Sequence, residues 1–198
     1  ESAALGSLGI AYLNFGQGAK AIETHDQALA LFRKVGDVQG EGAALGSLGA
    51  SYGNLGQHAK AIEFFEQALA LFRKVGDVQG EGAALRNLGI AYFNFGQDAK
   101  AFESREQALA LFRKIGDVKG ESAALRDLGI AYFNFEQGAK AIEYLDQALA
   151  IYRNIGDVQG VGDALGNLGL TYARFSQNAK AIEFLEAAQE IYENRGRN

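Results

Sequence analysis

Residues 37–76 read DVQGEGAALGSLGASYGNLGQHAKAIEFFEQALALFRKVG, and closely similar segments recur every 40 residues through the 198-residue chain. A fixed period of about 20 to 50 residues is typical of proteins in which short structural units stack on one another. We therefore predict a single solenoid domain over residues 1–198. Its five repeats are expected at residues 1–40, 41–80, 81–120, 121–160 and 161–198.

Each repeat is predicted to contain two amphipathic helices. In the quoted copy, apolar residues recur at spacings of three and four over residues 45–55, and Gly56 is expected to end this helix in a left-handed conformation. A second helix is predicted over residues 57–75. Asp37 can cap the first helix, because its carboxylate can accept free backbone N–H groups of the first turn. The predicted fold class is therefore all-α, with ten helices.

A glycine is expected in the middle of every first helix, at Gly9, Gly49, Gly89, Gly129 and Gly169. Glycine in the interior of a helix costs about 1 kcal/mol relative to alanine. Because all five copies keep the glycine, we expect another helix to pass so close to it that a Cβ atom would not fit.

The composition excludes several kinds of partner and site. The net charge is −5 without a run of like charges, so nothing indicates a nucleic acid or an anionic membrane as a partner. No apolar run approaches the roughly 18 residues of a membrane span. The absence of cysteine excludes disulfides, thiolate zinc sites and cysteine nucleophiles, and it agrees with a cytoplasmic location. We expect no cofactor and no metal.

No arrangement of residues indicates catalysis, and the chain is expected not to be an enzyme. His25 and His58 lie in different registers of different repeats. Many acidic residues recur at equivalent positions, such as Glu23, Glu63 and Glu103, whereas an active site is normally built once. We therefore expect these carboxylates to lie on solvated helix faces.

The repeat resembles the tetratricopeptide repeat family. The pattern of that family is a large apolar residue, a Leu-Gly pair, a tyrosine, an alanine, an aromatic residue and a second alanine. In the quoted copy these are Leu45, Leu48-Gly49, Tyr52, Ala61, Phe65 and Ala68. The tryptophan of the family is replaced by leucine, and its terminal proline is missing. The 40-residue spacing resembles the long-repeat subclass of Pins/LGN-type adaptors and similar bacterial arrays.

The resemblance implies a right-handed α-solenoid in which the first helix of each repeat lines a concave groove. It also implies a non-catalytic scaffold that binds a peptide or a helical segment of another protein in this groove. Carried over by position, the groove residues expected to contact the partner are Arg86, Asn87, Ile90, Phe93, Asn94, Arg126, Ile130, Phe133, Asn134, Asn54, Asn14 and Arg174.

The recurring asparagine near the end of the first helices is open to two interpretations. The amides of Asn14, Asn54, Asn94 and Asn134 can form a ladder that hydrogen-bonds an extended peptide. Alternatively, each amide satisfies backbone carbonyl groups in the last turn of its own helix.

Only repeats three and four place arginine and phenylalanine on the expected groove face. Arg86 and Phe93, beside an apolar floor, are residue types that binding hot spots favour, and the partner would then carry apolar anchors and an acidic group. The small residues Gly46, Ala50 and Gly53 of repeat two would leave room for a bulky ligand group. Alternatively, the phenylalanines pack on neighbouring helices and the arginines are solvated.

Two polar residues occupy a second-helix position that is Phe65 or Leu145 in other repeats. His25 and Arg105 either provide a polar contact on this face of the helix or are merely tolerated there. We favour tolerance, because arginine can lay its stem on apolar surface and keep its head in water.

The chain begins at Glu1 without methionine, and we expect it to be a fragment of a longer protein. The first repeat shows no polar capping change, which would allow self-association through it. Two other functions therefore stay open besides the binding scaffold. One is a structural spacer or self-assembling solenoid, and the other is a regulatory sensor region of a larger signalling protein.

Overall fold

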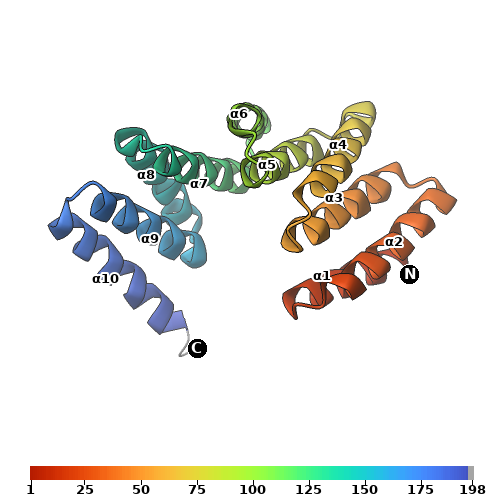
Figure 1. Ribbon diagram of the computed structural model, residues 1–198, viewed down its shortest axis with the longest axis horizontal. Coiled ribbons are helices and arrows are strands. Elements are labelled where there is room, and N and C mark those ends of the chain that lie inside the picture. The colour runs from red at the N-terminus through yellow and green to blue at the C-terminus, as the bar shows by residue number, and fades with distance from the viewer. Residues whose placement is uncertain (196–198) are drawn as a thin grey trace. The chain divides into compact units, whose positions relative to one another are not determined.

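The computed structural model describes residues 1–195, which form ten α-helices joined by short turns (Figure 1). The helices are α1 Ser2–Asn14, α2 Gly18–Val35, α3 Val38–Asn54, α4 His58–Val75, α5 Val78–Asn94, α6 Asp98–Ile115, α7 Val118–Asn134, α8 Gly138–Ile155, α9 Val158–Arg174 and α10 Asn178–Arg195. No strand occurs among these residues. The predicted fold class, an all-α solenoid of five helix–turn–helix repeats, is confirmed.

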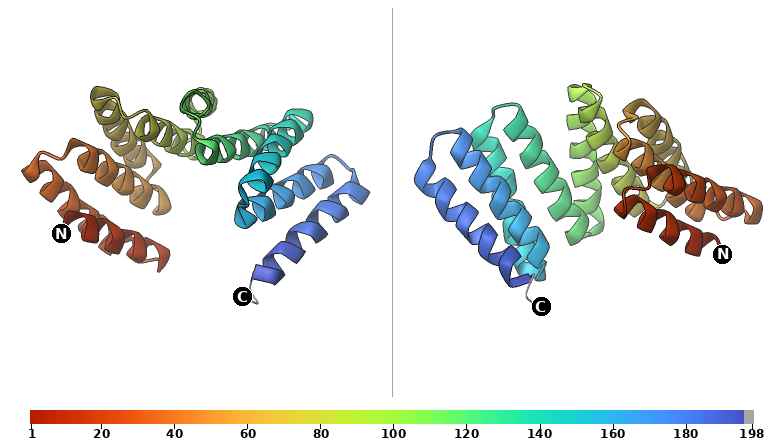
Figure 2. Two further views of the ribbon diagram at one scale, coloured as in Figure 1. Left: turned by 180° about the vertical axis from the view of Figure 1, so that it is seen from behind. Right: turned by 60° about the horizontal axis from the view of Figure 1, so that its bottom comes forward.

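The chain forms two compact units, Glu1–Ile115 with α1–α6 and Gly116–Asn198 with α7–α10. Consecutive helices within each unit pack as hairpins, as Figure 2 shows. In the first unit α1 contacts α3 and α3 contacts α5, whereas α2, α4 and α6 make no such contacts with one another among the described residues. The first helices of the repeats therefore form the inner layer of this unit. A single domain over residues 1–198 stays a prediction.

The turns between repeats are built as the sequence predicts. The carboxylate of Asp37 accepts a hydrogen bond from the Gly40 N–H at 2.9 Å, and Asp77, Asp117 and Asp157 cap α5, α7 and α9 in the same way. In the turn within repeat two, between α3 and α4, the left-handed conformation predicted at Gly56 is present, with φ 72°. Each cap satisfies backbone groups that a helix end would otherwise leave without a partner.

The glycines in the middle of the first helices lie where the second helices approach most closely, as predicted. A Cβ atom at Gly49 would come within 2.7 Å of the Phe65 ring, and one at Gly129 within 2.6 Å of Leu145 Cγ. Because atoms cannot pack that closely, any larger residue would force the facing side chain or its helix to shift.

A lysine lies over the repeated tyrosine in all five repeats, a contact that the sequence reasoning missed. The Lys60 Nζ atom is 5.0 Å from the centre of the Tyr52 ring, and the equivalent distances in the other repeats are 5.0 to 5.4 Å. Such cation–π contacts attract the ammonium group to the ring face. They tie the start of each second helix to the first helix of its own repeat.

Arg105 is buried on α6, with only 5% of its surface exposed. Its guanidinium lies 5.4 Å from the centre of the Phe93 ring on α5. The expectation that the head of this arginine stays in water is therefore wrong. The Gly89 backbone leaves the space that the arginine stem fills, since a Cβ atom there would lie 2.6 Å from Arg105 Cγ.

Candidate functional site

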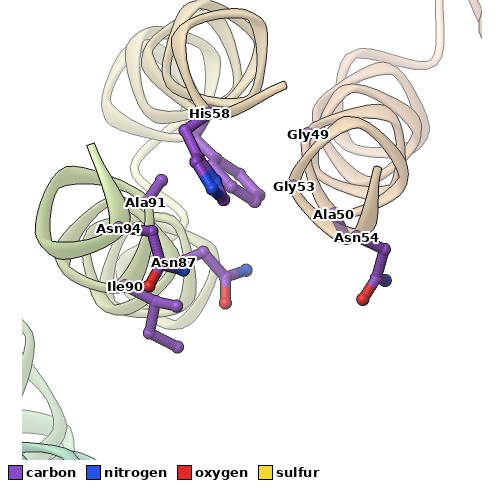
Figure 3. Close-up of a pocket in the computed structure, with 10 residues that line it drawn as sticks. Gly49, Ala50, Gly53, Asn54, His58, Asn87, Ile90, Ala91 and Asn94 are labelled. Carbon is purple, nitrogen blue, oxygen red and sulfur yellow. The ribbon is translucent and has the colours of Figure 1, made fainter. Parts of the chain in front are cut away.

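Two neighbouring cavities open on the inner layer of the first unit. The smaller one has a volume of about 220 Å³ and is shown in Figure 3. It lies between α3 and α5, and the first residues of α4 close one side of it. The lining residues are Gly49, Ala50, Gly53, Asn54, His58, Phe65, Asn87, Ile90, Ala91 and Asn94.

Four polar side chains surround this smaller cavity. Asn54 ends α3, Asn87 and Asn94 both lie on α5, and His58 begins α4 (Figure 3). Apolar residues complete the lining, including the buried Phe65. The arrangement offers hydrogen-bond donors and acceptors around an apolar floor, which is how small binding sites are commonly built.

The amides of Asn54, Asn87 and Asn94 make no hydrogen bond to another group within residues 1–195. The same holds for the exposed amides of Asn14 at the end of α1 and Asn134 at the end of α7. The alternative in which these amides satisfy carbonyl groups of their own helix is therefore not found. His58 Nδ1 is also buried without a hydrogen-bond partner in this part of the chain.

The larger cavity has a volume of about 470 Å³ and adjoins the smaller one, because Ala50 and Asn87 line both. It runs along α3 between α1 and α5, with α2 and α4 at its floor. Its volume lies within the range of about 300 to 1,000 Å³ that is usual for ligand sites. The lining residues are Ile10, Leu13, His25, Gly42, Ala43, Gly46, Ser47, Ala50, Ala68, Phe72, Ala83, Ala84 and Asn87.

The structure brings together four of the residues that the sequence predicts for the groove, namely Asn54, Asn87, Ile90 and Asn94. Asn14, Arg86 and Phe93 belong to the same unit but line neither cavity. The sequence reasoning missed His58, although its position is occupied by Gly18, Asp98, Gly138 and Asn178 in the other repeats. The available signal was that this position differs between repeats, whereas most neighbouring positions repeat the same residue.

Arg126 on α7 is already paired within the second unit. Its guanidinium lies 3.3 Å from a carboxylate oxygen of Asp127 and 3.3 Å from one of Asp163 on α9. Burial alone would lower the pKa of Arg126, but the neighbouring carboxylates outweigh burial and raise this pKa above its ordinary value. The Tyr192 hydroxyl also donates to Asp163, at 2.8 Å. An acidic group of a partner would compete with these carboxylates for the guanidinium.

Arg174, at the end of α9, also has partners within the second unit. Its guanidinium lies 5.0 Å from the centre of the Phe133 ring and donates a hydrogen bond to Glu136 at 2.9 Å. Ile130, on the same helix as Phe133, is half-buried. Phe133, like Phe93 in the first unit, thus packs against an arginine of a neighbouring helix.

His25 on α2 is fully buried in the wall of the larger cavity. Its Nδ1 lies 3.0 Å from Ser51 Oγ, and the Ser51 hydroxyl donates to the Ser47 carbonyl at 2.8 Å. The hydroxyl has only one hydrogen, so Nδ1 must be the donor to Ser51 Oγ. Nε2 is then the unprotonated nitrogen of the ring, and within the described residues it has no hydrogen-bond partner.

Replacing His25 with phenylalanine is expected to remove an acid sensitivity of the first unit. Burial lowers the pKa of His25 from 6.5, although the nearby Gly6 carbonyl and Asp26 act in the opposite direction. Below about pH 6.5 the unfolded chain therefore binds a proton more readily than the folded chain, and the free energy of unfolding falls. Phenylalanine fits, because Phe65 occupies the equivalent place against Gly49.

Urea unfolding at about pH 7.5 and about pH 5.5 measures this effect. The wild-type chain should lose more stability between the two conditions than His25→Phe. Other titrating groups are common to both proteins, so they cancel in the comparison. An equal loss in the two proteins would contradict a lowered pKa of His25.

Within residues 1–195, no three histidine or acidic side chains are placed to hold a metal ion together. No helix in this part of the chain combines the length and apolar character needed to cross a membrane.

Comparison with known proteins agrees with this architecture. A family model described as tetratricopeptide repeat matches residues 1–74, 40–114, 80–153 and 120–194. The comparison with curated proteins found no match.

Among solved structures, BtubC (BKLC) from P. vanneervenii is similar, with a TM-score of 0.82 and 21% identity over 97% of this chain and 80% of that one. The Q17M variant of a Podosopora anserina protein with nearly identical TPR-like repeats has a TM-score of 0.76 and 26% identity over 98% and 96%. A signal transduction ATPase from Pyrococcus horikoshii with a tetratricopeptide repeat sensor has a TM-score of 0.74 and 19% identity over 96% and 33%.

Proposed function

The chain belongs to the tetratricopeptide repeat family, and we propose that it is a non-catalytic protein-interaction module whose first unit binds a peptide or a helical segment along α1, α3 and α5. The observation that carries this proposal is the pair of cavities on the inner layer, which share Ala50 and Asn87. Repeat proteins of this kind present extended inner surfaces to their partners.

Unused hydrogen-bonding groups support the same surface. Asn54, Asn87 and Asn94 line the smaller cavity, and their amides have no hydrogen-bond partner in the described part of the chain, with Asn54 and Asn94 exposed to solvent. An extended peptide offers a donor and an acceptor on every residue, so it can satisfy amides of this type. The asparagine ladder remains part of the proposal in this form, restricted to the first unit.

The proposal is tested by selecting binders from a random peptide library displayed on phage, with the wild-type chain as bait. Selected peptides are then titrated into the ¹⁵N-labelled chain. We expect the largest shifts at Gly46, Gly53 and the side-chain amides of Asn87 and Asn94. The variant Asn87→Ala/Asn94→Ala should bind roughly tenfold more weakly.

Two outcomes would overturn the proposal: no selected peptide, or shifts confined to the outer helices α2, α4 and α6. Gln67→Ala, an exposed change on α4, serves as the control and should bind normally. An empty selection would favour the alternative of a structural spacer or self-assembling solenoid.

The similarity to the Pyrococcus horikoshii ATPase supports a second candidate, a sensor region within a larger signalling protein. The tetratricopeptide repeats of that protein are described as its sensor. In this second candidate the same cavities would receive the signal.

A further inference from the structure

Helix α3 carries two glycines, Gly46 and Gly53, that packing within the described part of the chain does not require. A Cβ atom at Gly46 would meet nothing within 4 Å in the described part of the chain, and one at Gly53 would lie 3.8 Å from Ala61 Cβ, an ordinary contact. At Gly42 and Gly49 of the same helix a Cβ atom would come within 2.8 Å and 2.7 Å of a phenylalanine ring. Packing therefore explains Gly42 and Gly49 but not the other two.

These two glycines weaken the helix without a compensating contact, since each costs up to about 1 kcal/mol relative to alanine. The fold tolerates large side chains at the equivalent places. The residues that correspond to Gly46, Ala50 and Gly53 in repeats three and four are Arg86 and Arg126, Ile90 and Ile130, and Phe93 and Phe133. The missing side chains of α3 are what opens the two cavities.

One buried imidazole nitrogen gives independent evidence for a hydrogen-bonding occupant of the smaller cavity. His58 lines this cavity and has an Nδ1 atom without a hydrogen-bond partner among residues 1–195. Buried polar atoms are normally hydrogen-bonded, and leaving one without a partner costs about 1 to 3 kcal/mol.

Neither cavity has a charged residue in its lining. Arg86, which the sequence predicts as a contact for an acidic group, is not among the residues that line either cavity. A carboxylate or ammonium group placed in either cavity would gain no opposite charge from the residues that line it, so nothing there would offset the part of its hydration that it loses.

From these observations we infer that the two cavities take one uncharged segment of the partner peptide. A bulky apolar side chain fills the larger cavity, and a neutral hydrogen-bonding side chain, a carboxamide or a hydroxyl, fills the smaller one. The inference rests on the proposed function and names the chemistry of its partner. It replaces the acidic group expected from the sequence.

The contacts assign the two side chains to the two cavities. Ile10, Leu13 and Phe72 give the larger cavity apolar walls of the kind that an aliphatic or aromatic group buries well. The smaller cavity offers the amides of Asn54, Asn87 and Asn94, which donate and accept equally and so match a neutral polar group. Because Ala50 and Asn87 line both cavities, the two side chains must be close neighbours on the segment.

The test uses the variant Ala50→Ile/Gly53→Phe, which fills the cavities with residues that α5 and α7 already carry. Gly53→Phe removes a helix glycine, so the thermal midpoint of the variant should equal or exceed that of the wild type. The probes are the peptides selected on the wild-type chain. We expect them to combine an apolar residue with a nearby neutral polar residue and to bind the variant at least roughly tenfold more weakly.

Salt dependence separates this inference from the proposed function. Binding without ion pairs should change less than about twofold between about 0.05 M and about 0.5 M NaCl, conditions that screen exposed charges very differently. Selected peptides that are rich in acidic residues, that lose roughly tenfold in affinity over this range, or that bind the filled variant normally would overturn the inference. Shifts along α3 and α5 would then still support the proposed function, whereas an empty selection would overturn both.

Discussion

Replacing Leu88 with alanine is expected to lower the free energy of unfolding by about 2 to 5 kcal/mol. Leu88 lies on α5 with 2% of its surface exposed, and its equivalents Leu48, Leu128 and Leu168 are fully buried. The change removes apolar contacts and leaves a cavity that neighbouring helices cannot fill completely. Urea unfolding followed by circular dichroism measures the loss.

Leu8→Ala is the matched control for this prediction. Leu8 has the same register in the first repeat but is 44% exposed in the structure. Its truncation should therefore cost much less than that of Leu88, because little apolar surface is lost from the interior. Equal losses at the two positions would mean that the repeats are not packed in the register described here.

Replacing Gly49 with alanine is expected to destabilise the chain by about 1 to 3 kcal/mol, whereas Gly46→Ala, three residues earlier on α3, should stabilise it by about 0.5 to 1 kcal/mol. Both changes raise the helix propensity of α3 by the same amount. They differ in surroundings, because a Cβ atom at Gly49 would press on the buried Phe65 ring and one at Gly46 would face open space.

Thermal and urea unfolding of the two variants beside the wild type checks the opposite signs. The Phe65→Ala background adds a control, because alanine removes the ring that a Cβ atom at Gly49 would meet. If the Phe65 ring is the cause, Gly49→Ala should cost less stability in this background than in the wild type. If Gly49→Ala and Gly46→Ala were both more stable than the wild type, α3 and α4 would have to be farther apart than in the structure.

Much of the fold could be predicted from the sequence because its signals are local and occur five times. The Leu-Gly pairs, the Asp caps and the left-handed glycines each depend on only a few neighbouring residues. Repetition added a test that single positions lack, since a costly glycine kept in five copies indicates a close contact. The structure bears out that contact at Gly49 and Gly129.

The candidate site was only partly predictable. Asn54, Asn87, Ile90 and Asn94 were expected on the groove face and do line the smaller cavity. His58 was set aside because His25 and His58 lie in different registers of different repeats, and the burial of the Arg105 guanidinium was not foreseen. In both cases the residues that surround the side chain come from another helix, so the spacing of residues along one helix does not indicate them.

Pattern along the chain was sufficient for the helices, their ends and their pairing, because hydrogen bonds and apolar stripes of a helix involve residues three and four apart. The cavities, the desolvated nitrogens of His25 and His58 and the pairing of Arg126 with Asp163 arise only in the tertiary structure. Each requires side chains from at least two helices to meet, and burial then sets their hydrogen bonding and charge.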